Sequence, residues 1–266
     1  MQRIRPPAVA GMFYPGDKAE LRHMVDSMLS KAKNRETGSP KALIVPHAGY
    51  IYSGSMAAKA YSLLDRRRIR RVVLLGPVHR VPVRGLALPD ADAFATSLGI
   101  IPLDITGMKA IEHMPQVCVS PQAHQQEHAL EVQLPFLQRR LDNFTLLPLA
   151  VGDAKPAEVA KVLSAVWGGD ETLILISSDL SHFHSYDEAQ HIDGLTSYNI
   201  RHLHVSISHD QACGATPVNG LLFLAARKDM RCRQLGLCNS GDTAGDKDRV
   251  VGYGSFAFYE GEHLAA

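Results

Sequence analysis

Two histidines stand where apolar segments of the chain end, and both are placed to bind a ligand. His47 follows ALIVP in the stretch ALIVPHAGYIYSG, residues 42–54. His79 follows VVLLGPV, so it also leaves a strand-like segment through a Gly-Pro turn. α/β proteins place ligand chemistry just outside the carboxyl ends of their strands, and imidazole is a common metal ligand. The two positions therefore predict a metal site at one edge of a sheet, the alternative being loop histidines that only bond to backbone.

A metal site needs a third protein ligand, and the loop CNSGDTAGDKDR (residues 238–249) offers Asp242, Asp246 and Asp248. Two imidazoles and one carboxylate with open coordination positions are typical of non-haem Fe(II) oxygenases, and zinc uses similar ligands. The loop is no EF-hand, because the glycine at the sixth position and the closing Glu are missing. Without the two histidines, an exposed Asp/Gly turn would be the better interpretation.

The stretch ISSDLSHFH places Asp179 and His182 three residues apart at the end of another apolar run. If the chain is helical there, both side chains lie on one face. A carboxylate that orients an imidazole suits a general acid or base beside a metal-bound substrate. The alternative is a helix N-cap by Ser178 or Asp179 with an incidental histidine.

The segment HQQEH (residues 124–128) matches the H-x-x-E-H pattern of one class of zinc proteases. A zinc hydrolase that uses His124, Glu127 and His128 is therefore an alternative function. The segment continues as ALEVQLPFLQRRL, an amphipathic pattern that needs burial, so we expect His124 and His128 not to share a metal. His128 is then expected to line the pocket or the core.

Cys213 lies in ACGATPVNG, just ahead of a helical pattern. The N-terminus of a helix favours a thiolate, which would suit a nucleophile. The other interpretation, which we favour, is that Cys213 lines the substrate pocket.

The pattern of elements around these residues predicts an α/β fold. Val, Ile and Leu-rich runs at 42–46, 71–77, 144–152 and 171–179 are typical of buried strands, and 249–260 predicts one more. Helical spacing occurs at 19–33, 53–64, 124–141, 156–167, 187–203 and 217–228. Alternation of the two indicates a largely parallel central sheet flanked by helices, and we expect residues 1–266 to form a single domain.

Composition excludes several classes of protein. The chain has 28 Lys and Arg against 27 Asp and Glu, so nothing in the total predicts binding to nucleic acid or to an anionic membrane. It has no apolar stretch of about 18 residues and no signal-peptide pattern, and its four cysteines form no C-x-x-C pair. We therefore expect a cytoplasmic protein with free thiols.

Several stretches together resemble the Memo family, also called AmmeMemoRadiSam system protein B. They are RPPAVAGMFYPGD, PHAGYIYSGSMAAKAY, LLGPVHRVP, EHALEVQLPFLQ, SSDLSHF, CGATP and NSGD, spread from Arg5 to about Phe258. The resemblance implies a fold like the catalytic subunits of class III extradiol dioxygenases. It also implies that His47 and His79 are metal ligands, that Asp179 is the acidic residue of the site, and that His182 is its acid or base.

This chain departs from the family pattern in two places. The family resemblance puts a cysteine (animal members) or a glutamate (the dioxygenases) at the third ligand, where this chain has Asp242 nearby. Val78 precedes the second histidine, where relatives commonly carry Ser or Asn.

The function implied by the resemblance is a metal site that acts on a small oxygen-donor substrate. We expect a divalent metal, Fe(II) first and Cu or Zn as alternatives, bound by His47, His79 and Asp242, with catalysis by His182 and Asp179. The alternative is a non-enzymatic module that binds a peptide or a partner protein in the same cleft. A radical-SAM protein is the partner that the family association implies.

Overall fold

The computed structural model describes residues 2–32 and 38–261 of the chain. The helices are α1 (Lys18–Lys31), α2 (Tyr50–Tyr61), α3 (Ile105–Ile111), α4 (Pro121–Gln125), α5 (His128–Glu131), α6 (Leu134–Arg140), α7 (Pro156–Ala165), α8 (Tyr186–Arg201), α9 (Ala215–Arg227) and the 3₁₀ turn η1 (Ser240–Asp242). The strands are β1 (Ile4–Arg5), β2 (Ala42–Val45), β3 (Arg71–Pro77), β4 (Leu86–Leu88), β5 (Ala93–Thr96), β6 (Gly99–Pro102), β7 (Val117–Val119), β8 (Thr145–Val151), β9 (Thr172–Ser177), β10 (His182–His184), β11 (Arg231–Asn239) and β12 (Val250–Tyr259).

The central sheet is mixed, with a parallel middle. Its strand order is β10-β12-β2-β9-β3-β8-β4-β7, and β11 pairs with β12. The strands β2, β9, β3 and β8 run parallel to one another. On either side of them the pairing turns antiparallel, at β12 with β2 and at β4 with β8. The expectation of a largely parallel sheet therefore holds for the centre, while the sides make the fold mixed α/β.

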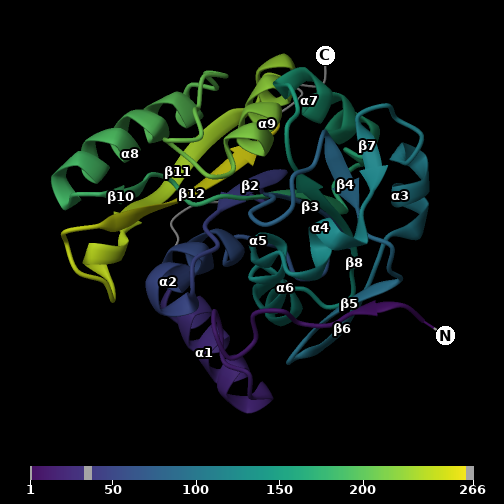
Figure 1. Cartoon of the computed structure of the whole chain (residues 1–266), viewed down its shortest axis with the longest axis horizontal. Coiled ribbons are helices and arrows are strands. Elements are labelled where there is room, and N and C mark those ends of the chain that lie inside the picture. The colour runs from purple at the N-terminus through teal and green to yellow at the C-terminus, as the bar shows by residue number, and fades with distance from the viewer. Residues whose placement is uncertain (1, 33–37, 262–266) are drawn as a thin grey trace.

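Both faces of the middle strands are buried. Leu43 and Leu74 belong to one apolar cluster, whereas their neighbours Ile44 and Leu75 belong to another. Successive strand residues point to opposite faces, so each cluster occupies one side of the sheet. Figure 1 shows α7 and α9 over one face and α1, α2 and α6 over the other. Burial on both faces explains why these strands are continuous apolar runs rather than alternating ones.

A second, three-stranded sheet is formed by β1, β5 and β6. Its strands β5 and β6 lie in the region 82–120, which also contains β4, α3 and β7. Outside this region the predicted strands and most of the predicted helices are present, whereas β1, β10 and β11 were not predicted. One helix was expected over 124–141, but the structure has three short ones, α4, α5 and α6.

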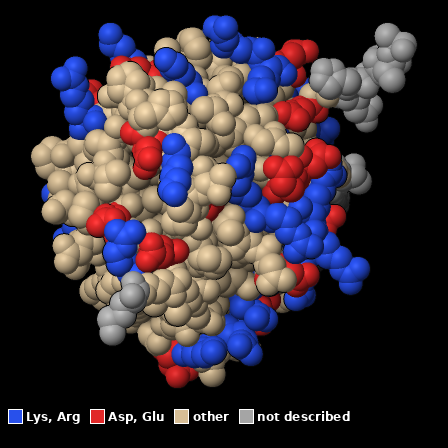
Figure 2. All heavy atoms as spheres, turned by 90° about the vertical axis from the view of Figure 1, so that its right-hand side faces the viewer, with Lys and Arg blue, Asp and Glu red and all other residues tan. Residues whose placement is uncertain are grey.

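The surface carries charges of both signs. On the face shown in Figure 2, Lys and Arg side chains lie among Asp and Glu side chains. None of the helices in the described part of the chain is both long and apolar enough to cross a bilayer.

Candidate metal centre

Three adjacent parallel strands end at the same edge of the sheet. The loop after β2 carries His47, the loop after β9 carries Asp179, and the loop after β3 carries His79. The order β2-β9-β3 brings these loops together, because parallel strands present their carboxyl ends on one side.

His47 is fixed by the end of β9. Its backbone N–H donates to Asp179 Oδ1 at 2.7 Å, and its Nδ1 lies 2.9 Å from Ser177 Oγ. The Ser177 hydroxyl donates to the carbonyl of Ala129, so its Oγ accepts a hydrogen bond from the Nδ1–H of His47. His47 therefore keeps its lone pair on Nε2. Burial lowers the pKa of His47 to about 3, which leaves the imidazole neutral and able to bind a metal.

His79 is held by Glu127. The backbone N–H of His79 donates to Oε2 at 2.7 Å, and its Nδ1 lies 2.8 Å from Oε1. Glu127 also accepts the N–H of Ala129. Burial would raise the pKa of Glu127, but the hydrogen bonds and charge of His79 outweigh it and lower the pKa to about 2. The ionised carboxylate holds the proton of His79 on Nδ1, and Nε2 is left for a metal.

His128 is the first residue of α5, and Glu127 caps this helix. Its Nδ1 lies 3.3 Å from Glu127 Oε1. Burial, followed by the nearby His47, lowers the pKa of His128 to about 4. The rings of His79 and His128 stack with their centroids 4.5 Å apart.

The three imidazoles form a candidate metal centre. One ring nitrogen from each of His47, His79 and His128 lies within 4.8 Å of the others. Metal–nitrogen bonds are about 2 Å long, so one ion can contact all three after small side-chain movements. In the part of the chain that the structure describes, this is the sole group of three or more potential ligands. The arrangement fits a divalent metal.

Asp242 does not belong to this group, and His128 takes the place that the sequence suggested for it. Asp242 Oδ1 accepts a hydrogen bond from the hydroxyl of Tyr186 at 2.5 Å, and Asp242 Oδ2 accepts one from the N–H of Asn239 at 2.9 Å. Oδ2 therefore caps the η1 turn, and Oδ1 ties this turn to the first residue of α8. Asp246 and Asp248 lie in the same loop, are exposed, and are likewise outside the group.

His124 points away from the centre, as expected. Its Nε2 lies 2.8 Å from the carbonyl of Ala87. The predicted single helix is broken at Glu127, whose backbone is extended. Because residues 124 and 128 no longer share a helical face, they cannot form the zinc site of a hydrolase. That alternative is overturned: Glu127 supports ligands instead of acting as a base between them.

The break between α4 and α5 is held by Arg5 from the N-terminal segment. Its Nε donates to the carbonyl of His124 at 3.0 Å, and its Nη2 donates to the carbonyl of Glu127 at 2.8 Å. The same guanidinium forms a buried ion pair with Glu131. Arg5 thus gives a side-chain donor to a carbonyl group on each side of the helix break.

Asp179 and His182 are not joined as expected. The segment between them is not helical, and Asp179 bonds to the backbone of the His47 loop instead. Burial raises the pKa of Asp179. The Nδ1 of His182 lies 2.9 Å from the carbonyl of Leu180. A carbonyl only accepts, so the proton of His182 is on Nδ1 and the lone pair is on Nε2.

A cavity of about 720 Å³ opens beside the centre. His79, His182 and Cys213 line it, together with apolar residues of α8. Cys213 Sγ lies 3.3 Å from His47 Nε2, next to the nitrogen that is free for a metal. Burial raises the pKa of Cys213 to about 12, so the thiol stays protonated in spite of its place before α9. Cys213 therefore lines the cavity as a protonated thiol, in line with the interpretation that we favour.

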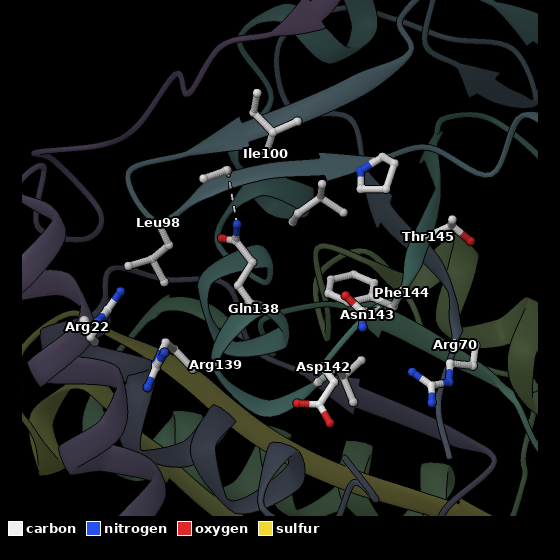
Figure 3. A pocket seen from close by; sticks show the side chains of 14 residues that line it. Arg22, Arg70, Leu98, Ile100, Gln138, Arg139, Asp142, Asn143, Phe144 and Thr145 are labelled. Atoms are coloured by element: carbon white, nitrogen blue, oxygen red, sulfur yellow. Dashed lines mark hydrogen bonds between the residues drawn. The ribbon is translucent and has the colours of Figure 1, made fainter. Parts of the chain in front are cut away.

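A separate depression lies between β6 and the end of α6 (Figure 3). Arg22, Arg70 and Arg139 line it, and Arg139 is paired with Asp26. It contains none of the residues of the metal centre.

The sheet, the helices on both its faces and the histidine centre at its carboxyl edge define the class: an α/β protein with a candidate strand-end metal site. A family model described as Memo-like protein matches residues 5–257. The chain belongs to the Memo family.

Relatives align over nearly the whole chain. A MEMO1 family protein of Aquifex aeolicus is 37% identical over 94% of this chain and 97% of its own length. One of Archaeoglobus fulgidus is 34% identical over 96% of this chain and 99% of its own. A solved structure of an uncharacterised protein from Escherichia coli K12 has a TM-score of 0.51 and 12% identity, covering 80% of this chain and 98% of that one. That likeness concerns the fold alone.

Proposed function

We propose that this protein binds Fe(II) through His47, His79 and His128 and uses it to oxidise a small oxygen-donor substrate with O₂. The observation that carries the proposal is the convergence of three imidazoles beside a cavity that also contains His182. The resemblance to class III extradiol dioxygenases supports iron, while imidazole ligands alone also suit zinc and copper.

The residues present fit a divalent metal in their hydrogen bonding as well as in their distances. His47 and His79 both hold a proton on Nδ1, through Ser177 and Glu127, and so offer Nε2 as donor. Metal-binding histidines in proteins are oriented by such partners on the other ring nitrogen. Three protein ligands on one side leave open positions toward the cavity, which a closed structural site would not.

When bound, Fe(II) would supply a Lewis-acidic, redox-active centre with open coordination positions. The protein would supply the proton transfer. His182 lines the cavity and has its lone pair on Nε2, so it can accept the proton of a substrate hydroxyl. Asp179 fixes the loop of His47 by accepting its backbone N–H. Cys213 fills space against His47 and limits access of water.

Oxygen consumption tests the proposal. The protein is loaded with Fe(II) without air, its iron content is measured, and O₂ uptake is followed over a panel of catechols and other vicinal oxygen donors. Replacing His182 with Ala should leave iron bound and slow turnover by about 10²- to 10⁴-fold. The control is His202→Ala, at an exposed histidine directly after α8, and it should keep wild-type rates.

Iron-loaded wild-type protein that stays inert over the whole panel would contradict the oxygenase proposal. It would favour the other function considered from the sequence, a module that binds a peptide or partner protein. Loss of iron in His182→Ala would instead make His182 a ligand.

A further inference from the structure

Phe183 is an aromatic residue in an unfavourable position. Its side chain is 63% exposed, and its backbone has a φ of 64°. A positive φ is rare for residues with a bulky side chain, because Cβ crowds the backbone. Because the ring is exposed, its burial does not offset the conformational strain of the backbone. Such strain persists where the surrounding structure imposes it, most often at functional sites.

The backbone of Phe183 forms a bulge that turns its side chain into the cavity of the metal centre. His182 pairs with Val251 and His184 pairs with Val250, so Phe183 is left between two consecutive partner positions. In a regular strand, neighbouring side chains point to opposite faces. Here His182, Phe183 and His184 all line the same cavity. Bulges beside active sites redirect side chains in this way.

The surroundings of the ring point to the kind of molecule it would contact. The guanidinium of Arg249 lies 5.0 Å from the ring centroid, on an exposed residue. Among the described residues, Arg249 forms no ion pair with a carboxylate. Ile192 and the exposed Leu195 add apolar surface from α8. Of the described residues in the cavity wall, Asp210 alone is acidic.

We infer that Phe183 is a ligand-contacting residue that selects molecules with an apolar body and an anionic group. The apolar body would pack on Phe183 and Leu195, and the anionic group would pair with Arg249. The inference rests on the proposed function in one respect: the cavity is taken to be the approach to the metal centre. The contacts themselves require no metal.

The experiment measures binding of 2-naphthoate, a flat apolar carboxylate, to the metal-free full-length protein by calorimetry. Phe183→Ala removes the ring but keeps a Cβ at positive φ. Phe183→Gly removes the ring and also the crowding of Cβ. Arg249→Met removes the charge. Asp229→Gly is the matched control, because Asp229 is also exposed with a φ of 52° but lies after α9, outside the cavity wall.

We expect both Phe183 variants to weaken naphthoate binding by about tenfold, and Arg249→Met by about threefold. Phe183→Gly should melt about 2–4 °C above Phe183→Ala, since glycine tolerates positive φ. Asp229→Gly should bind naphthoate like the wild type. Phe183→Tyr, which keeps the ring, should bind it too.

Two results would overturn the inference. One is wild-type naphthoate affinity in both Phe183 variants. The other is no binding to the wild type at about 5 mM naphthoate, weaker than the affinities of most specific sites. Failure of the proposed function has a different signature: no iron binding or oxygen uptake, with the naphthoate results intact.

Discussion

The carboxylate of Glu127 forms two hydrogen bonds with His79, one oxygen accepting the backbone N–H and the other accepting the ring Nδ1–H. This pair joins the loop after β3 to the first residue before α5, so it sets the positions of His79 and His128 together. The buried carboxylate is thus the support of two of the three candidate ligands.

Replacing Glu127 with Gln should weaken metal binding by about 10- to 100-fold. The glutamine amide would place an NH₂ group against one of the two N–H donors of His79, and the negative charge of the carboxylate would be lost. Metal affinity is measured by competition with a chelator of known affinity. Glu158→Gln is the control, since it is the same substitution at an exposed residue in the capping box of α7. Equal affinity in the two variants would contradict the role of Glu127.

The third ligand is tested by a pair of variants. His128→Ala should abolish tight metal binding, because two imidazoles remain. Asp242→Asn should retain wild-type metal content, since both oxygens of Asp242 are used by Tyr186 and Asn239. The metal content of each variant after anaerobic loading and desalting shows whether His128 or Asp242 is the third ligand. The opposite pattern would restore Asp242 as ligand.

The sequence could predict His47 and His79 because strand ends are visible as apolar runs that stop at Pro or Gly. Their convergence follows from parallel pairing, which alternating strands and helices imply. His128 could not be predicted in the same way. Its place depends on the break at Glu127, and this break is held by Arg5 from a distant part of the chain. The local sequence pattern instead predicts one continuous helix over residues 124–141, with no break at Glu127.

The bulge at Phe183 was hidden for a similar reason. Its conformation is set by pairing of β10 with β12, which are far apart in the sequence. The stretch SHFH contains no glycine, the residue that would indicate a positive φ in a sequence. The strand β11 was missed because its exposed positions carry charged residues and its apolar ones are interrupted by Gly236.

The packing of α7 on α9 predicts a sharp difference between two glycines. A Cβ at Gly220 would overlap the side chain of Val159, so Gly220→Ala should lower the free energy of unfolding by about 1–3 kcal/mol. Gly194 lies in α8 with no atom within 4 Å of such a Cβ. Gly194→Ala should therefore raise the free energy of unfolding by about 0.5–1 kcal/mol, the helix propensity of Ala over Gly. Urea titration measures both. A stable Gly220→Ala protein would mean that the two helices pack less closely.

The buried His124 predicts how stability depends on pH. Burial lowers its pKa from 6.5 to about 4 in the folded protein. Above about pH 6.5 the imidazole is neutral in both states and has no effect. As the pH falls below this, the unfolded chain binds a proton that the folded protein refuses until about pH 4, so stability is lost over this window.

His124→Gln removes this titration and keeps an amide that can donate to the carbonyl of Ala87. The free energy of unfolding of the wild type should fall relative to this variant by roughly 2–3 kcal/mol between about pH 7 and about pH 4.5. Urea titrations of metal-free protein at both pH values measure the difference. The control is His113→Gln at an exposed position, whose curve should follow the wild type. If His124→Gln lost stability in parallel with the wild type, His124 would have to accept a proton on Nδ1 in the folded state, and burial would then not lower its pKa.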